Sequence, residues 1–283
     1  MSIDNSLTIL SPEEISALDE IPKLDPDERV HFFDITSEDS DYLNTQTNIY
    51  NKINYILQAG YFKAARQFYQ FNFNDVRDDV HFIINHHFPK TVFPKKEVAR
   101  NQYYSAQRAI LKICDYQRYN AKSALLFSEQ VNRLAKRDFN PRFIFEELLN
   151  FCEQQMIIRP KYSTLQSLVS AGILRQEKIL FDKFGRLLDK DSKTSLDKLL
   201  ENENTMADLT LIKNDPKSFS TKDMRLELEK HQIISNLFKD SKDITPKLGL
   251  SRQNIQYYAG LCDFYDPWQL KRITYKRSRM YML

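Results

Sequence analysis

Hydrophobic positions recur at helical spacing along most of this chain. Within residues 47–60, apolar side chains stand at Ile49, Ile53, Ile56 and Leu57, the period of a helix that buries one face. No segment of four to eight residues alternates between apolar and polar side chains with hairpin turns on either side. The pattern therefore predicts an all-α fold of two or three small helical domains with helix-turn-helix-like elements. Further helices are expected near residues 75–87, 96–116, 120–137, 140–155, from 163 onward, 220–238 and 251–262.

Capping residues indicate where several helices begin and end. Ser11 with Pro12, and Asp25 with Pro26, each combine a capping side chain, a proline suited to the first turn and a glutamate at the third position. Two short helices are therefore expected to open the chain. Gly60 is expected to end the helix that starts near residue 47, and the prolines in residues 89–94 interrupt the next one.

The last third of the chain is predicted to be helical as well. Residues 189–205 are polar and lysine-rich, which is typical of a linker or exposed turn with one amphipathic helix. Asp266 and Pro267 begin a helix that reaches Leu283 with no glycine, proline or capping signal at its end. We expect from this that the chain is a fragment of a longer polypeptide. The alternative is that the apolar tail packs on its own core.

Charge is distributed unevenly along the sequence. The first 41 residues carry 12 acidic and 2 basic side chains, whereas the rest carries 26 acidic and 39 basic ones. Between Lys90 and Arg137 there are 11 basic and 3 acidic residues, a net charge of +8. A basic body attracts phosphate backbones. The acidic leader has a simpler explanation, because its carboxylates stand mainly in the first turns of predicted helices.

Several functional classes find no support in the sequence. The five glycines are too far apart for a phosphate-binding loop, and the five histidines show no HExxH spacing. The three cysteines lack a CxxC pair and are expected to be reduced structural thiols. No apolar run approaches the roughly 20 residues of a membrane span, so we expect no membrane contact. The N-terminus has no basic-then-apolar signal pattern, so we expect a bacterial cytoplasmic protein associated with the nucleoid. We expect no catalysis, metal or cofactor in this chain.

The strongest candidate surface lies on the predicted long helix at residues 96–116. Arg100, Tyr104, Arg108 and Lys112 recur at intervals of four and so share one helix face. We expect them to anchor DNA phosphates. A second basic group flanks aromatic residues of the preceding domain and is expected to contact phosphate if DNA lies nearby, although the aromatics themselves suit a core; it comprises Lys52, Lys63 and Arg66.

A second candidate is the helix pair within residues 145–171. Its second helix begins with side chains that reach base edges and phosphates when a recognition helix enters the major groove. The alternative is an ordinary corner between two helices with a polar cap. The expected contacts are Arg159, Lys161, Tyr162, Ser163, Thr164 and Gln166.

Two further segments fit DNA contact or a plain structural role. Residues 248–255 resemble a bacterial helix-turn-helix, in which Gly249 makes the turn and Ser251 caps the reading helix. Pro246 would then lie in the first turn of the supporting helix. The residues after Pro267 form a basic tail, which could bind phosphate or be the solvent-exposed face of a helix. Its cations are Lys271, Arg272, Lys276, Arg277 and Arg279.

Several motifs, taken in order, resemble the N-terminal region of Tn-three family transposases. They cover nearly the whole chain, and their collinearity is the specific part. They are Ile9-Leu10-Ser11-Pro12-Glu13-Glu14 with Ile21-Pro22, Asp27-Glu28-Arg29 with Phe32-Phe33 and Thr36, Asn51-Lys52-Ile53, Leu57-Gln58-Ala59-Gly60-Tyr61-Phe62-Lys63, Arg159-Pro160-Lys161-Tyr162-Ser163-Thr164-Leu165, and Asp215-Pro216-Lys217-Ser218-Phe219-Ser220.

The resemblance implies a replicative transposase whose N-terminal helical domains bind double-stranded DNA at the transposon's terminal inverted repeats. It implies an RNase H-like catalytic domain beyond Leu283, with an Asp-Asp-Glu triad and divalent metal, and homodimerisation of the full-length protein. No catalytic residue can be transferred to this chain. The family often has more arginine where this chain has lysine, tyrosine or asparagine, for example at the tyrosines within residues 102–108, which bears on individual base contacts.

Together these features predict a non-catalytic DNA-binding part of a transposase. Residues 1–90 and 91–190 are expected to be two DNA-binding domains, and residues 191–283 a connector to dimerisation and catalytic parts. One alternative is a stand-alone repressor that binds palindromic DNA through residues 248–255. Another is a helical scaffold whose basic face binds an acidic protein. An independent nuclease or transferase would need a carboxylate cluster that the sequence lacks.

Overall fold

The computed structural model describes residues 7–200, 208–241 and 244–282. Within these ranges it contains sixteen α-helices and no strand, which confirms the predicted all-α fold. A single isolated parallel bridge joins Gln117 and Ile157. None of the helices in the described ranges has both the length and the apolar character needed to cross a membrane.

The contacts divide the chain into two compact units that alternate along the sequence. Unit 2 comprises Thr8–Phe127 and Phe145–Gln166. Unit 1 comprises residue 7, Ser128–Ile144 and the described part of Ser167–Leu283. The three predicted blocks, by contrast, are consecutive.

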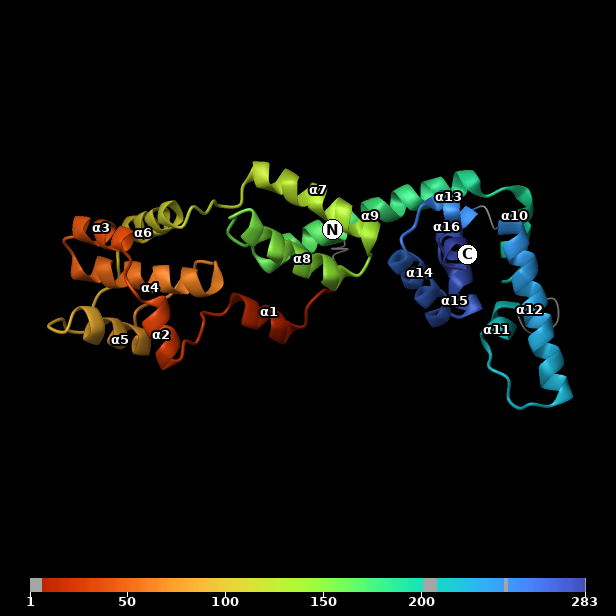
Figure 1. The fold of residues 1–283 in the computed structure, drawn as a ribbon, viewed down its shortest axis with the longest axis horizontal. Helices are drawn as coiled ribbons and strands as arrows, with labels where there is room; N and C mark the ends of the chain where they lie inside the picture. The colour runs from red at the N-terminus through yellow and green to blue at the C-terminus, as the bar shows by residue number, and fades with distance from the viewer. Residues whose placement is uncertain (1–6, 201–207, 242–243, 283) are drawn as a thin grey trace. The chain divides into compact units, whose positions relative to one another are not determined.

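The first six helices belong to unit 2 (Figure 1). They are α1 (Pro12–Asp19), α2 (Pro26–Phe32), α3 (Ser37–Thr45), α4 (Ile49–Ala65), α5 (Arg77–His87) and α6 (Arg100–Ile113). The next three contribute residues to both units, namely α7 (Ala121–Arg137), α8 (Pro141–Gln154) and α9 (Tyr162–Leu187). The remainder belong to unit 1: α10 (Lys190–Lys198), α11 (Asp208–Lys213), α12 (Thr221–Ser241), α13 (Ile244–Leu248), α14 (Arg252–Phe264), α15 (Pro267–Arg272) and α16 (Tyr275–Tyr281).

The capping signals set the helix starts that the sequence predicted. Ser11 and Asp25 accept hydrogen bonds from the third residue of α1 and α2, and each pair forms a full capping box. Asp266 does the same for α15. Helix α3 was not predicted from the sequence, because that segment is polar and buries only Asp39 and Leu43.

Helix α4 is the centre of the core of unit 2. Every residue from Ile53 to Phe62 is buried, and α4 packs against α2, α5 and α6 (Figure 1). The same core includes Ala106, Ile110 and Leu111 of α6. The segments on both sides of the prolines at 89–94 therefore share one hydrophobic core.

Gly60 does not end α4, contrary to the expectation from sequence. The helix continues to Ala65 and ends at Arg66, whose φ is 53° and whose N–H donates to the carbonyl of Phe62. A Cβ atom at Gly60 would lie 2.3 Å from the Cδ1 atom of Phe33, which is itself 1% exposed. The glycine is therefore explained by the close approach of Phe33 to α4.

We expect Gly60→Ala to lower the free energy of unfolding by about 1–3 kcal/mol, because the buried ring of Phe33 must move. Gly260→Ala is the matched control, since a Cβ there has nothing within 4 Å. That control should stabilise the chain by up to about 1 kcal/mol through helix propensity. Urea denaturation monitored by circular dichroism measures both, and equal stability of the two variants would contradict the packing role of Gly60.

Two buried tyrosines connect α4 to neighbouring helices. Tyr55 donates its hydroxyl to Asp39 of α3, and Asp39 also pairs with Lys63 at 3.0 Å. Tyr61 donates to Asp79 of α5, which pairs with Arg29 of α2 at 2.6 Å. Burial, reinforced by the bonded aspartates, strongly raises the pKa of both phenols. Each tyrosine therefore stays neutral and acts as a hydrogen-bond donor inside the core.

In unit 1, the start of α14 is fixed to the end of α7. Asn254 is 1% exposed; its side chain accepts from the N–H of Phe139 and donates to the carbonyls of Ala135 and Lys136. These bonds satisfy carbonyl groups that a helix end leaves unpaired. The local geometry expected for residues 248–255 is present, because Gly249 has a φ of 70° and Ser251 caps α14.

The apolar tail packs within unit 1. Met280, Tyr281 and Met282 are buried, and the ring of Tyr281 stacks on those of Tyr258 and Tyr265. The expected single final helix is instead α15 followed by α16, with a break at residues 273–274.

Candidate nucleic-acid interface

Helix α6 separates its residues cleanly into a buried and an exposed face. Ala106, Gln107, Ile110 and Leu111 are buried in the core of unit 2. The four residues predicted from the sequence are all exposed on the other side. We call this set the basic ridge; its members are Arg100, Tyr104, Arg108 and Lys112.

The basic ridge has the length of a groove-binding element. At a rise of 1.5 Å per residue, the twelve steps from Arg100 to Lys112 span about 18 Å. The major groove of B-DNA is about 12 Å wide. The ridge can therefore reach phosphates on both sides of the groove or follow one strand.

The cations of the basic ridge have no acidic partner. Arg100, Arg108 and Lys112 form no ion pair with any residue in the described ranges. The guanidinium of Arg100 lies 5.6 Å from the ring centre of Tyr104, a cation–π contact in which the ring attracts the positive charge. Positive charge that is not neutralised within the fold remains available for a ligand.

The surroundings of the basic ridge add to its positive potential. The first turn of α6 contains no acidic residue, and no side chain caps it, so the positive end of the helix dipole is uncompensated. Lys95 and Lys96, which were not among the contacts predicted from the sequence, are exposed just before α6. Exposed carboxylates stand at Glu97, which accepts from the N–H of Phe73, and at Glu38 and Asp41 of the packed helix α3.

Three predicted contacts lie on or just after α4, and two of them have partners in the fold. Lys63 is held by Asp39 and by the carbonyl of Asp34. Arg66 ends α4 and lies over the ring of Tyr116 at 5.8 Å. Lys52 is half-buried. Lys63 therefore has a structural role, and these residues form no continuous surface like that of α6.

The predicted contacts near the start of α9 face in different directions. Tyr162 is 7% exposed, with its hydroxyl accepting from the N–H groups of Ile9 and Leu10. Arg159 donates from Nε to Gln67 at 2.8 Å and from Nη2 to the carbonyl of Leu18. Neither side chain is available to a ligand in this structure, because both connect the start of α9 to other parts of unit 2.

The remaining residues of that group lie at or near the surface. Lys161 and Ser163 are exposed, and Thr164 and Gln166 are half-buried. Tyr162 turns inward because it precedes Leu165 by three residues, and both side chains fall on the core face of α9. The base-reading group predicted from the sequence is therefore reduced to the outward side of one helical turn.

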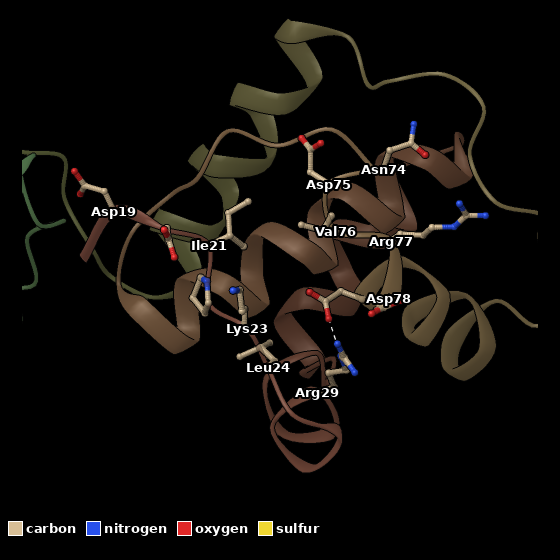
Figure 2. Close-up of a pocket in the computed structure, with 13 residues that line it drawn as sticks. Asp19, Ile21, Lys23, Leu24, Arg29, Asn74, Asp75, Val76, Arg77 and Asp78 are labelled. Carbon is tan, nitrogen blue, oxygen red and sulfur yellow. Dashed lines mark hydrogen bonds and ion pairs between the residues drawn. The ribbon is translucent and has the colours of Figure 1, made fainter. Parts of the chain in front are cut away.

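A cavity in unit 2 has the wrong charge for a phosphate. Its volume is about 810 Å³, and it lies between the end of α1, the segment before α2 and the start of α5 (Figure 2). Carboxylates outnumber cations on its wall, and the Arg29–Asp79 ion pair neutralises part of what remains. Its charged lining residues are Asp19, Glu20, Asp75, Asp78 and Asp79, with Lys23, Arg29 and Arg77.

The described residues bring together no cluster of potential metal-binding side chains. No set of three or more His, Cys, Asp or Glu side chains in those ranges could hold a metal ion. Burial raises the pKa of the Cys152 thiol to about 12 and also raises that of Cys114 and Cys262, so all three are protonated at neutral pH. His87 Nε2 forms a hydrogen bond of 3.0 Å with the carbonyl of Phe33.

A comparison with protein families places the chain in one of them. The family described as a domain of unknown function, DUF4158, matches residues 9–172. The match covers more than half of the chain, and we conclude that the chain belongs to this family. It includes the whole basic ridge and the start of α9. A comparison with curated proteins found no match.

Proposed function

We propose that this chain binds double-stranded DNA through the basic ridge of α6. The observation that carries the proposal is the row of exposed cations at Arg100, Arg108 and Lys112, none of which has an acidic partner in the described ranges. Solvated cations in a row release counterions from a phosphate backbone, which supplies most of the affinity of non-specific DNA binding. Lys95 and Lys96 extend the same charge toward the start of the helix.

We further propose that the chain is the non-catalytic DNA-binding part of a Tn-three family transposase and recognises terminal inverted repeats. Domains of the matched family occur in such transposases. The matched residues 9–172 contain most of the motifs that resemble them. Lys161 and Ser163, with Thr164 and Gln166 beside them, are the residues placed to contact base edges from the start of α9.

Quantitative footprinting tests the proposal. The chain should protect the inverted repeats that flank its gene more strongly than random duplex DNA, with an affinity that falls steeply with salt. Equal affinity for random DNA would contradict recognition of the repeats. Binding that does not depend on salt would contradict the role of the basic ridge.

The single variants Arg108→Ala and Lys161→Ala separate the two parts of the surface, and the double variant tests them together. Arg108→Ala alone should weaken binding to all duplexes and lower the salt slope by about 1. Lys161→Ala should reduce the preference for the repeats. Unchanged affinity and slope in the double variant would reject both assignments.

A second candidate function is a stand-alone repressor that reads DNA through α14. The observation in its favour is the turn at Gly249 and the cap at Ser251, which leave Arg252 and Gln253 exposed at the start of that helix. The same footprints distinguish the candidates. Protection of a palindrome that is lost in Arg252→Ala, and retained in Arg108→Ala, would favour the repressor.

A further inference from the structure

The basic tail of unit 1 is mostly neutralised within the fold. Three of its five cations form ion pairs with carboxylates of the same unit. The pairs are Lys276–Asp182 at 3.4 Å, Arg277–Glu177 at 2.7 Å and Arg279–Asp197 at 2.7 Å. Lys271 and Arg272 of α15 are exposed and pair with no carboxylate in the described ranges. The free charge of the tail is therefore concentrated on one short helix.

The same helix exposes the only tryptophan of the sequence. Trp268 is 61% exposed, whereas Leu270 on the opposite side of α15 is fully buried. The guanidinium carbon of Arg272 lies 3.9 Å from the centre of the Trp268 ring, a stacked arrangement. Residues 268, 271 and 272 follow the i, i+3, i+4 spacing and share a helix face. Phe264, four residues earlier, is 76% exposed.

We propose that Trp268, Lys271 and Arg272 form a stacking site for single-stranded nucleic acid. An exposed aromatic ring beside unpaired cations offers a flat surface for a base and charge for the adjacent phosphates. Bases within a duplex already have both faces covered by their neighbours, so unpaired nucleotides are the matching ligand. The inference concerns a different unit and a different ligand from the basic ridge, and it does not rest on the proposed function.

Two carboxylates lie close in sequence to this site. Asp266 accepts a hydrogen bond from the N–H of Gln269 and so is turned toward the start of α15. Asp263 lies before that helix, in α14. Lys271 and Arg272 lie at the other end of α15, where the negative end of the helix dipole favours cations. The phosphates of a bound strand would approach from that end.

Because Trp268 is the only tryptophan, its fluorescence reports directly on the site. We expect an oligothymidylate of about 12 nucleotides to quench the emission of the full chain in a saturable, salt-sensitive titration. The duplex of the same strand with oligodeoxyadenylate, and an abasic strand of equal length, should quench far less. The same quenching by all three would overturn the proposal, because it would indicate a response to charge without stacking.

Variants identify the residues responsible, with binding followed by anisotropy of a labelled oligothymidylate. Trp268→Ala should weaken binding about tenfold, the usual effect of losing one stacked base. Lys271→Gln with Arg272→Gln should lower the salt slope. Phe219→Ala is the matched control, since Phe219 is an aromatic of the same unit that is 97% exposed, and it should leave binding unchanged. Equal losses in Trp268→Ala and Phe219→Ala would overturn the proposal.

The basic-ridge variant Arg100→Ala, Arg108→Ala, Lys112→Ala distinguishes this inference from the proposed function. It should bind duplex DNA about 100-fold more weakly, while Trp268 is still quenched by the single strand. Loss of that quenching in the ridge variant would assign single-strand binding to α6 and overturn the inference. Absence of duplex binding in the unaltered chain, with quenching intact, would instead reject the proposed function alone.

Discussion

Replacing Arg100, Arg108 and Lys112 together by alanine is expected to weaken binding to duplex DNA by about 100-fold near physiological salt. Each phosphate contact contributes about 0.9 to the slope of log affinity against log salt on B-DNA, so the slope should fall by nearly 3. The three side chains are exposed and contribute nothing to the core. The variant should therefore fold normally, and electrophoretic mobility shifts over a salt series measure the effect.

The matched control removes the same charge from another helix. Lys222, Arg225 and Lys239 are exposed on α12 of unit 1, and their replacement by alanine changes the net charge by the same three units. Long-range attraction falls equally in both triple variants, whereas direct contacts are lost only on α6. Equal losses of affinity in the two variants would show that the basic ridge makes no special contribution.

The largest effect on stability is expected at Asp39. This side chain is 4% exposed, accepts from the hydroxyl of Tyr55 and pairs with Lys63. It also accepts the N–H of Thr36 at the start of α3. Asp39→Ala leaves a buried phenol and a partly buried ammonium without a partner, so it should lower the free energy of unfolding by about 3 kcal/mol. Hydrogen exchange of the α4 amides measures the loss within unit 2.

The same interaction has a defined pH dependence. Burial acts to raise the pKa of Asp39, but the hydrogen bond from Tyr55 and the charge of Lys63 outweigh it and hold this pKa below its usual value. A lowered folded-state pKa stabilises the fold above the ordinary pKa of aspartate, about 3.9, and that stabilisation disappears as the pH falls through the folded value. The stability difference between the unaltered chain and Asp39→Asn should therefore shrink below about pH 4.

Lys63 connects this stability prediction to the DNA-binding hypothesis. Lys63→Met should destabilise unit 2 through the loss of its partner Asp39, while the salt slope of DNA binding stays unchanged. A lower salt slope in Lys63→Met, with unchanged stability, would return this lysine to the set of phosphate contacts.

The class of fold and most helix starts could be predicted because they depend on local signals. Ser11, Asp25 and Asp266 each form capping hydrogen bonds with a residue three positions later. Both partners are therefore visible in the local sequence. The exposed face of α6 could be predicted for a similar reason. The spacing of Arg100, Arg108 and Lys112 fixes them on one side of a helix whose opposite side is apolar.

The residues that the sequence did not place correctly depend on partners far along the chain. Gly60 carries a common signal for a helix end, but Phe33 requires a residue without a side chain there. Tyr162 and Arg159 have the chemistry of DNA contacts, yet the N–H groups of Ile9 and Leu10, and Gln67, take up their polar atoms. No local pattern specifies the contacts of Tyr162 and Arg159, because they form only when segments more than 90 residues apart meet.

The alternation of the two units along the chain has a consequence for synthesis. All residues of unit 2 have left the ribosome once Gln166 has emerged. Unit 1 cannot complete its folding until α16 has emerged as well. Domains translated earlier generally fold first. On the ribosome-bound nascent chain, α6 would therefore already be folded with its cations exposed to solvent. At that stage the residues against which Ser128–Ile144 packs in unit 1 would not all have been synthesised.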